Sequence, residues 1–398
     1  MRKIEYVASD ERLITPSGLS LVGQVLGKSN LIKKANCMRT VKRSQPQIKN
    51  GDIILTMIGL LSLGKSDFEN VNEFHKDEEF YKIALGIAYG IPSESSLRNR
   101  LDGIGTSMDQ QILAGNVDMF LSCGYEPSPL ANGCVPVDID VSPFDNSGSH
   151  KAGVSRTYKN FDGYAPIFAY IGTEGYLCNA ELREGRQHCQ SGTPEFLTET
   201  IAAAKQMTKK ALLFRMDSGN DALENMLLLH WHDPQLKFLI KHNFRREDRY
   251  AIAEELKNVC KNVKHPRDGK TVYIGSTWRN FETEKDGKFA IRMVYEITER
   301  TTDANGQDML FPEGMTDGHL KLCATEAILI TIIHLRMYYQ HKVLPDLVCS
   351  LRKSVIMRFI LMMNGGWSVS SIHWEMICCF TLNYIRWDIM CLFILILA

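Results

Sequence analysis

Two stretches with the pattern of β-strands end in carboxylates at points where the chain can turn. The first is VPVDIDV, in which the alternation of a strand places Asp138 and Asp140 on one face and apolar residues on the other. The second is ALLFRMD, which ends on Asp217 and continues into Ser-Gly. Two carboxylates on one face repel each other unless a cation or a positively charged side chain lies between them. These strand ends are therefore candidates for cation binding.

The two strand ends together would support a definite chemistry. Active sites on open α/β sheets gather at the carboxyl ends of the strands, although a single Asp before Ser-Gly is more often only a turn former. If the strands are neighbours, Asp140 and Asp217 supply the hard oxygen ligands that a pair of Mg²⁺ ions about 3.5 to 4 Å apart requires. Such a pair serves phosphoryl transfer, because one ion activates the attacking oxygen and the other stabilises the leaving oxygen.

Other metal sites fit these residues less well. A calcium loop of the EF-hand kind over the first strand end fails, because Pro143 stands where the loop needs glycine and Ser149 where it needs a bidentate Glu. Three histidines could be offered as ligands, but none has the spacing of a zinc site: His150, His188 and His242. Isolated histidines of this kind are more often structural.

The chain that must position these groups has 398 residues, 44% of them hydrophobic, and zero formal net charge. Two or three domains are expected at this length. Because there is no overall positive excess, any affinity for nucleic acid must come from charge segregation along the chain. The first 50 residues carry ten Lys and Arg against three acidic residues, so segregation of this kind is present.

Residues 1–130 are predicted to form a helical domain, because several segments space apolar residues three and four apart. The segment FYKIALGIAYGIPSESSLRNRLDGIG has a helix, a Gly-Ile-Pro break and a Ser-capped second helix carrying Arg98 and Arg100. This order is typical of a helix-turn-helix, which would present both arginines to DNA. Many helical hairpins bind no DNA, so both interpretations stay open.

Residues 131–235 change to short β-branched and aromatic runs: three strands, a helix and a further strand. That order opens a mixed α/β sheet. Residues 236–312 are rich in strands separated by polar turns such as HPRDGK, and we expect either an insertion in the α/β domain or a small separate one. Residues 313–398 form an atypical C-terminal tail.

The stretch from DIDVSPFDNSGSHKAGVSRTYKNFDGYAPIFAYIG to TPEFL, followed by LLFRMDSGNDALEN, FLIKHNFRRED and HPRDGKTVYIGSTWR, resembles the DDE transposases of bacterial insertion sequences, members of the RNase H-like superfamily. The resemblance covers roughly residues 1–312. It implies an RNase H-like mixed sheet with a β-rich insertion. It also implies that Asp140 is the first catalytic acid, with Asp138 as the second choice, and that Asp217 is the second. Both would bind Mg²⁺ or Mn²⁺, as two ions.

The resemblance also implies how the chain meets DNA. Terminal inverted repeats and target DNA are the expected partners, bound by a homodimer. Lys241, Arg245 and Arg246 of the β-rich stretch would lie near the DNA backbone, and Arg156 and Lys159 at the edge of the active site. For the last two, a solvated loop is an equally good interpretation.

The third acid is where the sequence departs from the family. Relatives carry a helix with Tyr, two residues, Arg, three residues, Glu, six residues and Lys. The tail offers Tyr339, Lys342, Asp346 and Lys353 at that spacing, so Lys replaces Arg and Asp346 replaces the catalytic Glu. Five of the eleven cysteines follow Leu320, which suggests that the tail is translated out of frame. A single-base shift in the gene after about codon 312 that restores a helix with Glu would confirm this.

Three functions are therefore open: an active transposase, a catalytically inactive remnant that only binds DNA, and a metal-dependent nuclease. Neither a CxxC pair nor the apolar core of a signal peptide is present, which favours a reduced, cytoplasmic chain in a bacterium. The terminal run IMCLFILILA is too short to span a bilayer as a helix, so no membrane partner is expected.

Overall fold

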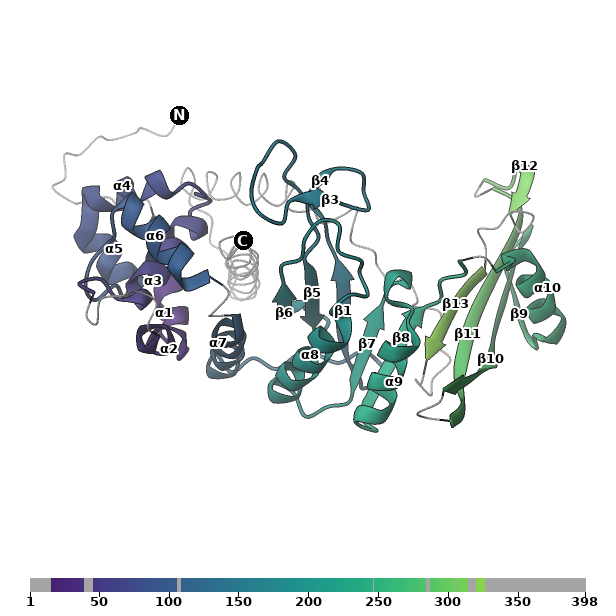
Figure 1. Ribbon diagram of the computed structural model, residues 1–398. Coiled ribbons are helices and arrows are strands. Elements are labelled where there is room, and N and C mark those ends of the chain that lie inside the picture. The colour runs from purple at the N-terminus through teal and green to yellow at the C-terminus, as the bar shows by residue number, and fades with distance from the viewer. Residues whose placement is uncertain are drawn as a thin grey trace, which may run out of the picture.

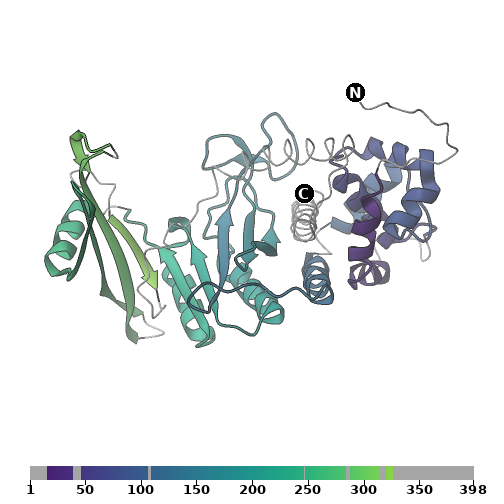
Figure 2. The ribbon, with the colours of Figure 1, turned by 180° about the vertical axis from the view of Figure 1, so that it is seen from behind.

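The computed structural model describes residues 16–38, 46–105, 109–245, 247–283, 287–303, 305–313 and 320–325. Three parts follow one another along the length of the molecule in chain order: a helical part, a mixed sheet covered by helices, and a group of long strands (Figure 1). The view from behind shows the same succession (Figure 2). None of the helices in the described ranges is both long and apolar enough for a bilayer span.

The helical part has its own hydrophobic core around the central helix α3, Asn50–Ser62, whose residues from Asn50 to Leu61 are all buried. The other α-helices are α1 Leu19–Leu26, α2 Leu31–Cys37, α4 Val71–Phe74, α5 Glu78–Leu85, α6 Glu94–Ile104 and α7 Asp109–Ser122. Short 3-10 turns cover Phe68–Asn70 and His75–Asp77. A helix that is apolar all round must be buried, and its neighbours cover it.

The predicted break between two helices lies where the sequence places it. Helix α5 ends at Gly86, whose φ of 75° is a left-handed conformation that glycine adopts without strain. Helix α6 begins after Ser93, whose side chain accepts a hydrogen bond from the backbone N–H of Ser96. Buried Asp52 of α3 accepts from the N–H groups of Ala88 and Tyr89 and so fixes the connection. The structure therefore contains the predicted succession of a helix, a turn and a second helix.

The central part is a mixed sheet with the strand order β6-β5-β1-β7-β8. Its strands are β1 Val135–Val141, β5 Ile167–Ile171, β6 Tyr176–Glu181, β7 Leu212–Met216 and β8 Leu236–Lys241. The pairs β1–β5 and β5–β6 are antiparallel, whereas β1–β7 and β7–β8 are parallel. Helices α8, Thr193–Met207, and α9, Leu223–His232, pack along it (Figure 1). The expectation of a mixed α/β sheet with helices is confirmed, and its strand order is consistent with an RNase H-like class.

The strand-rich part continues the same sheet instead of forming a separate one. Beyond β8 the order is β13-β11-β10-β9, and β12 pairs with β11. The elements are α10 Arg249–Val259, β9 Asn262–Arg267, β10 Lys270–Thr283, β11 Gly287–Thr302, β12 Asp308–Glu313 and β13 Leu320–Thr325. The sequence indicated a polar turn over HPRDGK, but its first three residues, His-Pro-Arg, belong to strand β9. The turn between β9 and β10 consists only of Asp268 and Gly269. Strand β13 joins the central part to the strand-rich part, although its residues belong to the stretch expected to be atypical.

A small sheet follows β1 directly. It consists of β2 Phe144–Asp145, β4 Asp162–Tyr164 and β3 Ser155–Arg156 in that order. The short strands hold the loop that carries Tyr158 and Lys159. Asn160 in this loop has a φ of 65°, a left-handed conformation that Asn tolerates better than most residues.

Candidate active site

Asp140 and Asp217 lie side by side at one edge of the central sheet. The parallel register pairs Val135 with Leu212 and runs to Ile139 with Met216, so Asp140 and Asp217 are the next two residues in register. Residues opposite each other on neighbouring strands about 4.8 Å apart project to the same face of a sheet. Burial and the negative charge of Asp217 raise the pKa of Asp140 to about 7. Burial is the larger cause of this shift, and the neighbouring carboxylate of Asp217 adds to it.

Asp138, the second choice for the first acid, has a different partner. It lies opposite Arg215 in the same register, and the guanidinium donates to both carboxylate oxygens, each at 2.5 Å. Its charge is therefore balanced by an arginine, whereas Asp140 faces another carboxylate. The sequence contains the signal for this difference: Arg215 precedes Asp217 by two residues, as Asp138 precedes Asp140. The geometry favours Asp140 as the cation ligand.

The carboxylate of Asp217 is held by the turn that follows it. Its Oδ1 accepts hydrogen bonds of 3.0 Å from the N–H of Gly219 and from Nδ2 of Asn220. Asp217 caps a short 3-10 helix, Ser218–Asn220, which is the turn that the Ser-Gly sequence predicts. A Cβ at Gly219 would lie 2.9 Å from Sγ of Cys189 and 3.1 Å from Oδ1 of Asp217. Close packing therefore requires glycine at this position.

A buried polar network supports this turn from behind. Asn225 of α9 donates from Nδ2 to the carbonyl of Asn220 at 3.0 Å, and it exchanges two side-chain hydrogen bonds with Gln190. Both asparagines are 0% exposed. Cys189 donates its S–H to the carbonyl of Gly219 at 2.9 Å. The network fixes the turn, and sequence reasoning missed it, although Asn225 inside an otherwise apolar helical run was a signal.

Arg183 anchors the loop that brings Cys189 and Gln190 to the site. The arginine is 2% exposed, pairs with Glu181 at 2.8 Å and donates to the carbonyl of Cys189 at 3.0 Å. Its guanidinium also donates to the hydroxyl of Thr193 at the start of α8. A buried arginine with these partners holds a loop in place more than it offers a charge to solvent.

Tyr158 is a further residue beside the two acids that sequence reasoning missed. Its hydroxyl donates to the carbonyl of Val141 at 3.4 Å, while the side chain is 66% exposed. Burial of the hydroxyl, together with the charges of Asp140 and Asp217, raises the pKa of Tyr158 to about 12. The hydroxyl is therefore protonated at neutral pH and can donate a hydrogen bond. Exposed Lys159 lies near enough for its positive charge to lower the pKa of Asp140, against the larger raising effects.

Among the described residues, the carboxylate oxygens of Asp140 and Asp217 are suitable ligands for a hard divalent cation. Two carboxylates that oppose each other's ionisation would be relieved by a cation between them. In the described ranges, no three His, Cys, Asp or Glu side chains come together as a complete metal cage. Asp346, the candidate third acid, lies outside those ranges. Asp140 and Asp217 are thus the carboxylates at this sheet edge that could hold a metal ion, and their role as ligands stays a prediction.

The candidate DNA contacts in α6 differ in what they touch. Arg98 pairs with Glu94 at 3.5 Å and lies over the ring of Phe68, with half of its side chain exposed. Arg100 donates to the carbonyl of Ile48 at 2.7 Å and to the side chain of Asn50. Arg100 therefore ties α6 to the start of α3. DNA contact by either arginine stays a prediction, and Arg98 is the more exposed of the two.

The other basic candidates lie around the sheet edge. Arg156 is exposed and 3.7 Å from Asp162, and Lys241 lies at the end of β8. Arg245 has a left-handed φ of 49° and donates to the carbonyl of Asp221 at 3.2 Å. Arg246 lies outside the described residues. Their contact with DNA also stays a prediction.

The model of the family described as "Transposase DDE domain group 1" matches residues 1–281. The chain belongs to this family of DDE transposases. The resemblance read from the sequence is therefore confirmed at the level of the family, while the bacterial insertion sequence stays a prediction. Members of the family generally use a divalent metal.

Among solved structures, the chain is similar to one described as a piggyBac transposase synaptic complex with hairpin DNA. The two are 13% identical, the match covers 96% of this chain and 73% of that one, and the TM-score is 0.38. No curated protein matches the chain.

Proposed function

We propose that this chain is a transposase that binds the terminal inverted repeats of its element and cuts and joins DNA by divalent-metal-dependent phosphoryl transfer. Asp140 and Asp217 are its metal ligands, for Mg²⁺ or Mn²⁺ as two ions. The observation that carries the proposal is the parallel register of β1 and β7, which places both acids at one sheet edge and leaves Asp140 with a pKa of about 7. Family membership supports the reaction class.

Each residue of the proposed site has a separate role. Ions bound there would activate the attacking oxygen and stabilise charge on the leaving oxygen. The turn after Asp217 fixes the direction of its carboxylate through Oδ1. Asp140 becomes a ligand once it has lost its proton. The neutral hydroxyl of Tyr158 would turn from the carbonyl of Val141 to donate to a phosphate oxygen, and Lys159 would attract the DNA backbone.

A nicking assay tests the proposal. The substrate is a DNA fragment that carries the ends of the element encoding the chain, incubated with Mg²⁺ or Mn²⁺ or with EDTA. We expect metal-dependent nicks at the element ends, followed by joining to target DNA. Repeat binding without any nick would contradict the enzymatic proposal and identify the inactive remnant, which the substitution at the third acid favours. Nicks without joining would identify a nuclease.

Replacing Tyr158 with Phe should lower the nicking rate about 10- to 100-fold. A hydrogen bond to a charged group contributes about 1.5 to 3 kcal/mol, and each 1.4 kcal/mol is about tenfold in rate. The side chain keeps its ring, so binding of repeat DNA in a gel-shift assay should stay the same. Exposed Tyr250 on α10 provides the control substitution, Tyr250→Phe. Equal rates for Tyr158→Phe and wild type would remove the hydroxyl from the mechanism.

DNA affinity should fall steeply with salt, because phosphate contacts release counterions. Lys241→Gln and Arg245→Gln should each make the slope of log K against log salt shallower by about 1. Lys209→Gln, an exposed lysine beyond the end of α8, should leave the slope unchanged. Fluorescence anisotropy across a salt series measures all three. A slope that the first two substitutions do not alter would show that these residues lie off the DNA path.

A further inference from the structure

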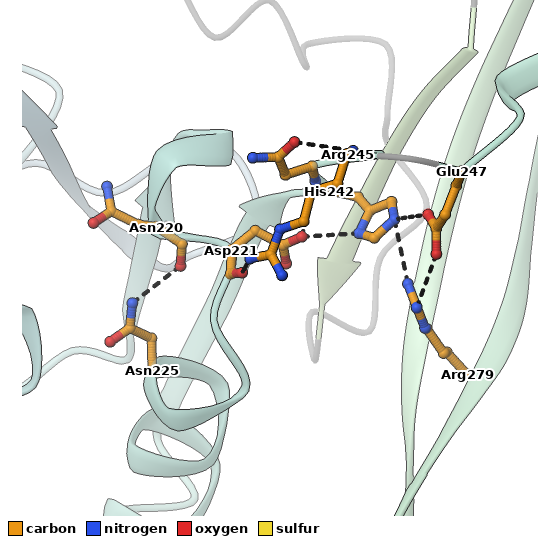
Figure 3. Close-up of polar contacts among 8 residues, drawn as sticks. Asn220, Asp221, Asn225, His242, Arg245, Glu247 and Arg279 are labelled. Atoms are coloured by element: carbon orange, nitrogen blue, oxygen red, sulfur yellow. Dashed lines mark hydrogen bonds and ion pairs between the residues drawn. The ribbon is translucent and has the colours of Figure 1, made fainter. Parts of the chain in front are cut away.

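A polar cluster connects the loop after Asp217 to the strand-rich part of the sheet. Its centre is His242, directly after β8, which is 7% exposed. The imidazole Nδ1 lies 2.9 Å from Oδ2 of Asp221, and Nε2 lies 2.6 Å from Oε2 of Glu247 (Figure 3). One ring therefore bridges two carboxylates from different segments. His242 is neither one of the catalytic residues implied by the family resemblance nor one of the proposed metal ligands.

A second layer extends the cluster into strand β10. Arg279 donates from its guanidinium to Oε1 of Glu247 at 3.0 Å, and its other terminal nitrogen lies 3.2 Å from Nε2 of His242 (Figure 3). We place a proton on Nε2, because the carboxylate of Glu247 is the closer partner and can only accept. On the other side, Asp221 accepts from the N–H of Asn243 at 2.8 Å. The cluster thus runs from the active-site loop to the strand-rich part.

The charges in the cluster balance only when the imidazole is protonated. His242 and Arg279 are then the cations, and Asp221 and Glu247 the anions. Burial lowers the pKa of His242, but the hydrogen bonds and charges of Asp221 and Glu247 outweigh it, so the net pKa is raised. Neutral histidine has a single N–H, so one of the two carboxylates would lose its hydrogen bond from the imidazole.

Other charged groups near the ring come from the strands and the helix around it. Lys241 precedes His242 on its own strand. Phe244 packs edge-on against the imidazole, and Arg249 of α10 lies over the ring of Phe244. Cys323 of β13 is kept neutral, because burial raises its pKa to about 12. Among the described residues, the charged groups in direct contact with the imidazole are therefore two carboxylates and one guanidinium.

We propose that His242, as an imidazolium, is a positioning residue for Asp217. It holds Asp221, four residues further along the same loop, and fixes that loop to Glu247 and Arg279. The side chain of Asp221 is 8% exposed, so its charge has few partners other than those in this cluster. Loss of the imidazolium would leave a buried carboxylate uncompensated and shift the loop that orients Asp217. This inference rests on the proposed function.

The test compares His242→Gln with His232→Gln, an exposed histidine at the end of α9. A misplacement of about 1 Å costs about a hundredfold in rate, so His242→Gln should nick DNA about 10- to 100-fold more slowly and bind it normally. Wild-type nicking should decline at high pH as His242 loses its proton, and this decline should be absent in His242→Gln. His232→Gln should behave as wild type. A His242→Gln variant with the wild-type rate and pH profile would overturn the inference.

Two further readouts separate this inference from the proposed function. In histidine-labelled NMR spectra, His242 should titrate above the ordinary histidine pKa of about 6.5, and in hydrogen exchange the N–H of Gly219 should lose protection in His242→Gln. Neither measurement requires nicking. If wild type does not nick but both results appear, only the proposed function fails. If His242 titrates at or below the ordinary histidine pKa, the inference fails. Glu247→Gln, which changes a more exposed partner, serves if His242→Gln does not fold.

Discussion

Asp140→Asn and Asp217→Asn should each reduce metal-dependent nicking by about a thousandfold or more, with repeat binding retained. Asparagine keeps the size of the side chain but loses the negative charge that a hard cation requires. Bound metal contributes several kcal/mol to stabilisation of the transition state, and about 4 kcal/mol corresponds to a thousandfold in rate. Rates over a Mn²⁺ series, with gel-shift assays alongside, measure the effect.

Two other substitutions serve as matched controls for this result. Asp145→Asn changes an exposed carboxylate in β2 just beyond β1, and we expect the wild-type rate. Asp138→Asn removes the partner of Arg215, so it should lower the melting temperature while nicking falls less than in Asp140→Asn. Equal loss of nicking in Asp138→Asn and Asp140→Asn at matched stability would contradict the distinction between the two acids.

Asp140→Asn should also stabilise the protein, and only at higher pH. In the folded chain the pKa of Asp140 is about 7 against an ordinary value of 3.8, so the folded state binds the proton more tightly than the unfolded state. Wild-type stability therefore falls as pH rises from about 4 to about 7, by up to about 4 kcal/mol. Asparagine has no such charge, so the variant escapes the loss.

Thermal melts in EDTA at pH 5 and pH 8 measure this effect. For a folded unit of about 150 to 250 residues, such as residues 131–325 around the two acids, 1 kcal/mol shifts the melting temperature by about 2 to 4 °C. The variant should therefore melt several degrees above wild type at pH 8 and close to it at pH 5. Mn²⁺ should raise the melting temperature of wild type at pH 8, because it balances the two carboxylates. The same difference between variant and wild type at both pH values would show that Asp140 is not electrostatically strained.

The sequence predicted the strands of the central sheet and their order along the chain because alternation and β-branched residues are local signals. Asp138 and Asp140 share a face, as the alternation in β1 requires. Ser93 and Gly86 mark the ends of neighbouring helices for similarly local reasons. That Asp140 lies close to Asp217 was only an expectation from the sequence, because it depends on the pairing of β1 with β7.

Features that depend on register or on distant contacts could not be predicted in this way. The choice between Asp138 and Asp140 required knowing that Arg215 lies opposite Asp138. Tyr158 reaches the site through a loop whose path no local pattern specifies. Strand β13 was missed because its position between β8 and β11 depends on pairing with both. Asp346, the candidate third acid, lies outside the described residues, and the gene sequence is the direct test of the tail.

Crystals grown with Mn²⁺ at pH 8 give the most direct test of the central claim, because the anomalous signal of manganese locates the ions independently of activity. The account predicts bound Mn²⁺ in contact with carboxylate oxygens of both Asp140 and Asp217. Manganese bound elsewhere, or the two carboxylates on opposite faces of the sheet, would contradict it.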